Sequence, residues 1–154
     1  MAILVSCKRV LSAGTETFAP VSRIEAIRIL LAFAAFTSMK LYQIDVKSAF
    51  LNGTILKEVY VSQPPGFENE LLSSHVFKLN KALYGLKQAP HAWYEKLSSF
   101  LTNNNFIRGK IDSTLFRKDI KDFIIVQIYI DDIILRSDPE RAIPNLERAV
   151  PAHI

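Results

Sequence analysis

The sequence predicts a single α+β domain in which helices pack on one face of a β-sheet. Short apolar runs rich in Ile, Val and Tyr predict strands, and two segments with helical spacing of apolar residues lie between them. The chain has 154 residues, of which 49% are hydrophobic and 22% charged. These values are typical of one ordinary globular domain that is long enough to build a real core.

Two segments have the apolar spacing of helices. The first opens with Ser22-Arg23-Ile24-Glu25 just after Pro20, which fits a capping box at a helix N-terminus. Its apolar residues predict one stripe packed on the core, namely Ile24, Ile27, Leu31, Ala34 and Ala35. The second helix is expected from Ala92 to Leu101, followed by asparagines, which tolerate the backbone conformation of helix ends.

The predicted strands are Leu41 to Val46, Glu58 to Ser62, Val76 to Leu79, Thr114 to Lys118 and Phe123 to Tyr129. The last two are expected to form a hairpin. Asn52-Gly53 predicts a turn, while Gly85 and Pro90 are expected to bracket a loop. The tail after Asp138 has helical character, which Pro144 would interrupt.

Two adjacent carboxylates, Asp131 and Asp132, lie between apolar runs and predict a tight hairpin turn. Like charges held this close repel unless a cation lies between them, and hard oxygen ligands favour Mg²⁺ over zinc. Asp45, near the end of an upstream strand, could supply the third carboxylate of a two-metal site. The alternatives are an ordinary acidic turn and a strand-end capping aspartate.

Charge and composition suit several cellular partners. The net charge of +4 suits a nucleic-acid partner and equally an ordinary lysine-rich surface. Cys7 is the only cysteine, so no internal disulfide is expected and a reducing intracellular compartment is the default. The longest apolar stretch, Ile29 to Phe36, is far too short to span a membrane, and no signal peptide is recognisable. No membrane partner is therefore expected.

A series of motifs follows in a fixed order. They are Thr17-Phe18-Ala19-Pro20-Val21, Asp45-Val46-Lys47-Ser48-Ala49-Phe50-Leu51-Asn52-Gly53, Gln63-Pro64-Pro65-Gly66-Phe67, Lys81-Ala82-Leu83-Tyr84-Gly85-Leu86-Lys87-Gln88-Ala89-Pro90, Asp112-Ser113-Thr114-Leu115-Phe116 and Tyr129-Ile130-Asp131-Asp132. Together they resemble the reverse transcriptase domain of copia-type LTR retrotransposons. The resemblance divides the chain into a divergent N-terminal segment (1–16), a palm and fingers region (17–137) and a divergent tail (138–154).

The resemblance implies an RNA-directed DNA polymerase that uses two-metal nucleotidyl transfer, on a palm-like antiparallel sheet with part of the fingers. Asp45, Asp131 and Asp132 would be the catalytic metal carboxylates, and Val46 would lend its carbonyl oxygen. The implied cofactor is Mg²⁺, or Mn²⁺ in its place. The implied partners are an RNA or DNA template with its primer and deoxynucleoside triphosphates.

The family pattern also suggests nucleotide-binding residues. The backbone N–H groups of Ser48 and Ala49 would cradle the triphosphate. Phe50 would exclude a 2′-hydroxyl as a sugar gate, or it is simply a core residue. The loop residues that would lie against nucleotide and template are Tyr84, Gly85, Lys87 and Gln88. For Lys87 a solvated surface role is equally open, and Trp93 and Tyr94 are expected to fill core more often than to stack on bases.

The sequence departs from the family pattern in several places. His91 replaces a usual Arg, a Gly usual near Arg136 is missing, and residues 1–14 do not match the basic fingers strand. The thumb, RNase H and integrase regions have no counterpart, so a truncated polyprotein copy is expected. The alternatives are a non-catalytic remnant that keeps the fold and weak nucleic-acid binding, and a domesticated interaction module.

Overall fold

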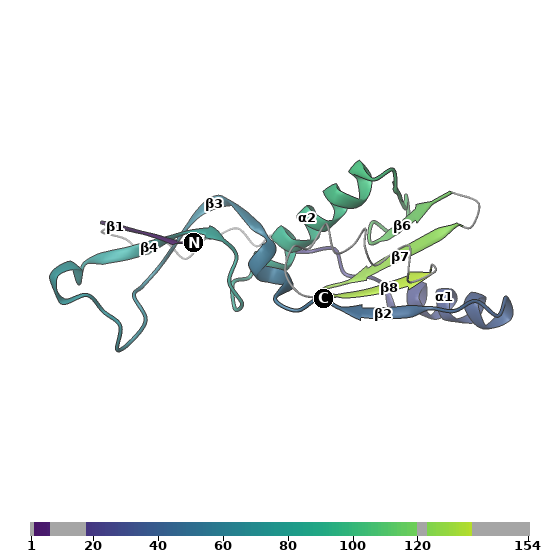
Figure 1. Cartoon of the computed structure of the whole chain (residues 1–154), viewed down its shortest axis with the longest axis horizontal. Helices are drawn as coiled ribbons and strands as arrows, with labels where there is room; N and C mark the ends of the chain where they lie inside the picture. The colour runs from purple at the N-terminus through teal and green to yellow at the C-terminus, as the bar shows by residue number, and fades with distance from the viewer. Residues whose placement is uncertain (1, 7–17, 120–122, 137–154) are drawn as a thin grey trace.

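The computed structural model describes residues 2–6, 18–119 and 123–136 (Figure 1). Their elements are β1 (Ala2–Ser6), α1 (Ile24–Phe36), β2 (Tyr42–Asp45), η1 (Ala49–Asn52), β3 (Thr54–Val61), η2 (Glu70–Leu72), β4 (His75–Lys81), α2 (Ala89–Asn103), β5 (Ile107–Arg108), β6 (Leu115–Lys118), β7 (Ile124–Tyr129) and β8 (Asp132–Arg136). The α+β class is confirmed. The predictions for Cys7 and the C-terminal tail lie outside the described residues.

The strands form two antiparallel sheets. The larger sheet has the order β2-β8-β7-β6-β5, and the smaller has the order β1-β4-β3. Figure 1 shows the two sheets at opposite ends of an elongated molecule, with one end of α2 between them. The larger sheet is consistent with the predicted palm, and β6 and β7 form the predicted hairpin.

The core lies between α2 and one face of the larger sheet. Trp93, Tyr94, Leu97 and Leu101 of α2 pack against strand residues that include Phe116, Val126, Ile128, Ile133 and Leu135. The exposed fraction is 1% for Trp93 and 3% for Tyr94. The prediction that both rings fill core is therefore confirmed, and neither is available to stack on a base.

The start of α2 differs from its prediction. The helix begins at Ala89, so Pro90 lies in its first turn and does not bound a loop. Proline is tolerated there because the first N–H groups of a helix have no partner within it. A Cβ atom on Gly53 would come within 2.9 Å of both the Ala92 Cβ and the Trp93 nitrogen. Close packing against α2, more than a turn conformation, therefore explains this glycine.

The predictions for α1 are partly wrong. The N-cap residue is Arg23, one residue after the predicted Ser22, and no side chain caps the helix there. The Ser22 hydroxyl instead accepts a hydrogen bond from Gln127 Nε2 at 2.8 Å. Leu30 and Ala34 are the buried residues of α1. Ile24, Leu31 and Ala35 of the predicted stripe are exposed, which shows that helical periodicity alone misjudged the buried face.

Gln127 ties the segment before α1 to the larger sheet. Val126 and Ile128 face α2, so the side chain between them points to the opposite face of the strand. There its Nε2 reaches Ser22 and, at 2.6 Å, the Thr114 hydroxyl. The start of α1 is thus fastened to the face that α2 leaves open.

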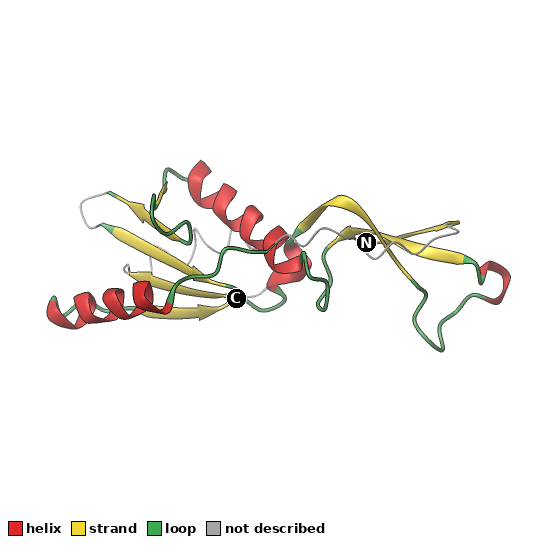
Figure 2. Ribbon diagram, turned by 180° about the vertical axis from the view of Figure 1, so that it is seen from behind, coloured by secondary structure: helices red, strands yellow, loops and turns green. Residues whose placement is uncertain are grey.

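The loop between β3 and β4 connects two neighbouring strands of the smaller sheet, and the sequence predicted it to be irregular. Gln63 is buried, and its Nε2 donates to the carbonyl oxygens of Leu72 and His75 at 2.8 and 3.0 Å. Its Oε1 accepts from the Asn69 nitrogen at 2.8 Å. Figure 2 shows this loop at the end of the molecule farthest from α1. Among the described residues, no helix has the length and apolar character needed to cross a membrane.

Candidate active site

The strand register places two of the predicted carboxylates side by side. Asp45 is the last residue of β2 and Asp132 the first of β8, and the antiparallel pairing sets them directly opposite each other. Directly opposed residues carry their side chains on the same face, with Cβ atoms roughly 4.5–5.5 Å apart. Two negative charges therefore share one position at the end of the sheet.

Asp131 lies in the turn between β7 and β8. Tyr129 and Asp132 pair across this hairpin, and the Val46 nitrogen donates to the Asp131 carbonyl oxygen at 3.2 Å. The backbone thus holds Asp131 next to the end of β2. In the described part of the chain, however, no three Asp, Glu, His or Cys side chains gather closely enough to hold a metal ion. Convergence of all three carboxylates remains a prediction.

A hydrogen bond from α2 holds the turn between β7 and β8. Ile130 has a φ of 58°, a left-handed conformation that is unusual for a β-branched residue. The Trp93 indole N–H donates to its carbonyl oxygen at 3.1 Å. This bond between Trp93 and the turn was not predicted. The only available signal in the sequence was that a buried Trp N–H usually finds an acceptor.

The carboxylates face away from α2. Ile133 of β8 packs in the core, so its neighbour Asp132 points to the other face of the strand. On that face, Gln43 Nε2 donates to Asp132 Oδ1 at 3.3 Å. Gln43 was not predicted, although its spacing of two residues from Asp45 places both on one strand face. On this face Asp45 is exposed and Asp132 is half-buried.

The segment after β2 turns tightly. Ala49 donates its N–H to the Val46 carbonyl oxygen at 3.2 Å, and Ser48 has a left-handed φ of 57°. The Val46 carbonyl, which was predicted to bind metal, and the Ala49 N–H, which was predicted to bind triphosphate, are thus hydrogen-bonded to each other. The carbonyl retains a second lone pair, whereas the Ala49 N–H would have to leave its partner to bind phosphate.

Two predicted nucleotide-binding residues from distant segments come together. The Phe50 and Tyr84 rings have centroids 4.8 Å apart and are tilted by 47°. Phe50 is partly buried against the core, and Tyr84 is exposed. Gly85 follows with a φ of 88°, in the turn closed by the Leu86 N–H to Leu83 carbonyl bond of 3.3 Å. This left-handed conformation explains the glycine.

The rest of the predicted loop leads into α2. Lys87 is exposed, and Gln88 is the half-buried residue just before the helix. His91, at the position where a family Arg was expected, has its Nε2 3.9 Å from Glu95 Oε1. Arg136, where a family Gly was expected nearby, stacks on the Phe123 ring at 3.6 Å from its centroid.

Comparison with known families decides the identity of the fold. A family model described as "Reverse transcriptase (RNA-dependent DNA polymerase)" matches residues 10–154. The chain belongs to the reverse transcriptase family. The resemblance expected from the ordered motifs is thereby confirmed.

This reverse transcriptase chain is similar to plant transposon proteins. It is 42% identical over 131 residues to the retrovirus-related Pol polyprotein from transposon RE1 of Arabidopsis thaliana, covering 84% of this chain and 9% of that protein. It is 44% identical over 121 residues to the Pol polyprotein from transposon RE2 of the same plant, which covers 78% of this chain and 8% of that protein. It is 39% identical over 134 residues to the Pol polyprotein from transposon TNT 1-94 of Nicotiana tabacum, which covers 86% of this chain and 10% of that protein. The chain thus spans about a tenth of the length of these relatives.

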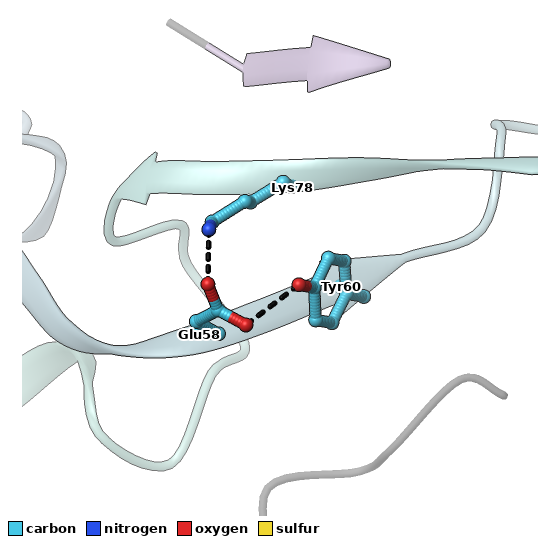
Figure 3. Close-up of polar contacts among 3 residues, drawn as sticks. All are labelled: Glu58, Tyr60 and Lys78. Carbon is cyan, nitrogen blue, oxygen red and sulfur yellow. Dashed lines mark hydrogen bonds and ion pairs between the residues drawn. The ribbon is translucent and has the colours of Figure 1, made fainter. Parts of the chain in front are cut away.

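A charged cluster on the smaller sheet was not predicted. Figure 3 shows Glu58 of β3 between Lys78 of β4 and Tyr60, whose hydroxyl donates to Glu58 Oε2 at 2.7 Å. The hydrogen bond from Lys78, followed by that from Tyr60, lowers the pKa of Glu58, and Glu58 in turn raises the pKa of Lys78. Glu58 is exposed and the other two side chains are partly exposed, so solvent screens their interaction.

Proposed function

We propose that this chain is an RNA-directed DNA polymerase domain in which Asp45, Asp131 and Asp132 form the catalytic centre. The observation that carries the proposal is the register that sets Asp45 directly opposite Asp132. Two carboxylates at adjoining strand ends repel each other, and a divalent cation between them would remove that repulsion. Family membership supports the same role for the pair.

The donor set fits a hard divalent cation. Carboxylate oxygens are the ligands that Mg²⁺ prefers, and Mn²⁺ shares this preference. Asp45 and Asp132 would hold the cation, while Asp131 and the Val46 carbonyl would complete the set. When bound, the metal lowers the pKa of an attacking hydroxyl and neutralises the charge of a leaving group.

Nucleotide addition requires a primer 3′-hydroxyl to attack the α-phosphate of a triphosphate, with pyrophosphate as leaving group. The protein contributes position and charge stabilisation to this step. Asp45 and Asp132 would hold the reacting groups at the open end of the sheet. Phe50 and Tyr84, whose rings touch, would form a wall beside the sugar. The triphosphate would be held by the backbone of Ser48 and Ala49.

The remaining predicted residues would contact the nucleotide and its template. Lys87 and Gln88 follow Gly85 and lead directly to the start of α2. Lys87 is exposed and would approach phosphate as a point charge. Template–primer and deoxynucleoside triphosphates are the proposed partners, and the thumb, RNase H and integrase regions of a Pol polyprotein would act with this domain.

The test is primer extension on an RNA template with Mg²⁺ or Mn²⁺. The intact chain should extend the primer, while Asp45→Asn and Asp132→Asn should not. Asp119→Asn is the matched control, because this exposed carboxylate follows β6 at the opposite end of the β6–β7 hairpin from the catalytic residues. Template binding without extension in either metal would support the non-catalytic remnant instead.

A further inference from the structure

Asp132 lies on a strand that has a neighbour on each side. Strand β8 runs between β2 and β7 in the larger sheet (Figure 1). Across β2, Asp132 stands directly opposite Asp45, and across β7 it stands opposite Tyr129. Directly opposed residues share a sheet face, here the face that α2 does not cover. Within the sheet, the side chains nearest to the Asp132 carboxylate therefore come from this face of β2 and β7.

Gln43 reaches Asp132 along the diagonal between β2 and β8. Its direct partner on β8 is Ile134, two residues beyond Asp132. Diagonal neighbours on one sheet face are roughly 7–8 Å apart, a distance that long side chains can span. The Gln43 Nε2 donates to Asp132 Oδ1 at 3.3 Å. The hydrogen bond thus depends on the length of the glutamine side chain as well as on its amide.

The Gln43 amide sets Asp132 apart from the other two proposed catalytic carboxylates. It occupies one carboxylate oxygen of Asp132 and leaves the second oxygen available. Among the described residues, no side chain donates to the carboxylates of Asp45 or Asp131. A carboxylate that is held at one oxygen presents the other in a fixed direction. The orientation of Asp132 is therefore set before any cation arrives.

The charge of the donor matters as much as its position. An amide N–H donates a hydrogen bond without carrying a positive charge. The negative charges of Asp45 and Asp132 therefore remain available to attract a cation. A Lys or Arg side chain in place of Gln43 would neutralise part of this charge and repel the cation.

We propose that Gln43 is a positioning residue of the catalytic centre, which holds one oxygen of Asp132 so that the other is directed at a divalent cation shared with Asp45. This role rests on the proposed function, because it requires that the acidic pair binds a cation. Gln43 itself would touch neither the cation nor the nucleotide. Hydrogen-bond partners of metal-binding side chains contribute about 10–100-fold to metal affinity.

Mg²⁺ titration of the intact chain, followed by thermal unfolding, tests the proposal. Gln43→Met keeps a similar length without a donor and should raise the Kd for Mg²⁺ about tenfold. Tyr42→Phe is the matched control, because it removes a polar group from the neighbouring residue of β2, whose partner Leu135 packs in the core. Its Kd should equal that of the parent. Gln43→Met that binds Mg²⁺ as tightly as Tyr42→Phe would overturn the proposal.

Two further variants separate the length of the side chain from its charge. Gln43→Asn keeps the amide but is shorter, so it should weaken Mg²⁺ binding about as much as Gln43→Met. Gln43→Lys should raise the unfolding temperature in chelator yet weaken Mg²⁺ binding, because its charge takes the place of the cation. A lysine variant that binds Mg²⁺ like the parent would contradict the role of an uncharged donor.

The response of the parent chain reports on the metal centre itself. A parent without any Mg²⁺ response would refute the metal centre and the role of Gln43 together. A response that is lost in Asp45→Asn but unchanged in Gln43→Met would refute the role of Gln43 alone. Urea denaturation in chelator accompanies each titration. A merely structural role of Gln43 would lower the stability in chelator and leave the Kd for Mg²⁺ unchanged, which would also overturn the proposal.

Discussion

The indole N–H of Trp93 donates a hydrogen bond to the carbonyl oxygen of Ile130, 3.1 Å away. Trp93 is buried in α2, and Ile130 is the left-handed residue of the turn that carries Asp131. Helix α2 therefore holds the acidic hairpin through Ile130, the residue of its turn that has a left-handed backbone conformation. Strained backbone persists only where the surrounding structure over-determines it, and this bond provides one such constraint.

Trp93→Phe should loosen the acidic hairpin. It keeps an aromatic ring but leaves the Ile130 carbonyl without its partner, at a cost of about 1–3 kcal/mol in the free energy of unfolding. Urea denaturation with and without Mg²⁺ measures this cost. Tyr94→Phe is the control, because it removes a comparable 2.8 Å bond to the Ser113 carbonyl oxygen. Only Trp93→Phe should also weaken stabilisation by Mg²⁺, and an equal response of the two variants would contradict the role of the indole.

Gly53→Ala should destabilise the junction between η1, β3 and α2. The added methyl would lie 2.9 Å from the Ala92 Cβ, and overpacking of this kind costs about 1–3 kcal/mol. Ala92→Gly removes the opposing methyl and alone should cost about 1 kcal/mol as a helix glycine. In a double-mutant cycle of chemical denaturation, the combined cost should be smaller than the sum. Strict additivity would show that the cost comes from the backbone at Trp93, whose nitrogen is also 2.9 Å away, and not from the Ala92 methyl.

Asp45→Asn should stabilise the chain slightly when no divalent metal is present. Like charges directly opposite in a sheet are destabilising, and removing one should gain about 0.2–1 kcal/mol in the free energy of unfolding. Added Mg²⁺ should stabilise the unmodified chain progressively but not the variant, since only the former keeps the pair. Thermal melts across a Mg²⁺ titration measure both effects. A variant less stable than its parent in chelator would argue against repulsion between Asp45 and Asp132.

Phe50→Val should relax discrimination between sugars in any preparation with polymerase activity. A smaller side chain makes room for a 2′-hydroxyl, and loss of such a steric contact changes selectivity by about tenfold. The ratio of deoxyribonucleotide to ribonucleotide incorporation is the readout. Leu51→Val serves as control, because Leu51 is the exposed neighbour in η1. An unchanged ratio would leave Phe50 as a core residue that supports Tyr84.

Glu58→Gln should lower stability only above acidic pH. The pKa of Glu58 is lowered from its ordinary 4.5, so the carboxylate contributes stability above that pH and loses it as the pH falls through the folded-state value. Denaturation midpoints of parent and variant should therefore differ slightly near neutrality and converge once the pH falls below the folded-state pKa of Glu58. Lys78 has a raised pKa, so its contribution is lost only above its ordinary 10.5. A constant difference at both pH values would exclude the ion pair.

Much of the local structure followed from the sequence. The apolar run that ends at Asp45, the β6–β7 hairpin and the acidic turn were predicted at or near their observed positions. Side-chain periodicity and turn residues act over a few neighbouring positions, so a single sequence reveals them. Trp93 and Tyr94 were likewise placed correctly in the core, because large aromatic residues on a helix gain most from burial.

Tertiary structure alone decided the relationships between distant segments. The pairing of Asp45 with Asp132 depends on strand register, and the Gly53 contact depends on how closely α2 approaches η1. Ser22 was expected to cap α1, yet its hydroxyl binds Gln127 from a strand far along the chain. Local spacing carries no information about which distant partner competes for a polar group, or which helix face a sheet covers. The sequence therefore determined the elements and the candidate residues, whereas packing decided which of those residues meet.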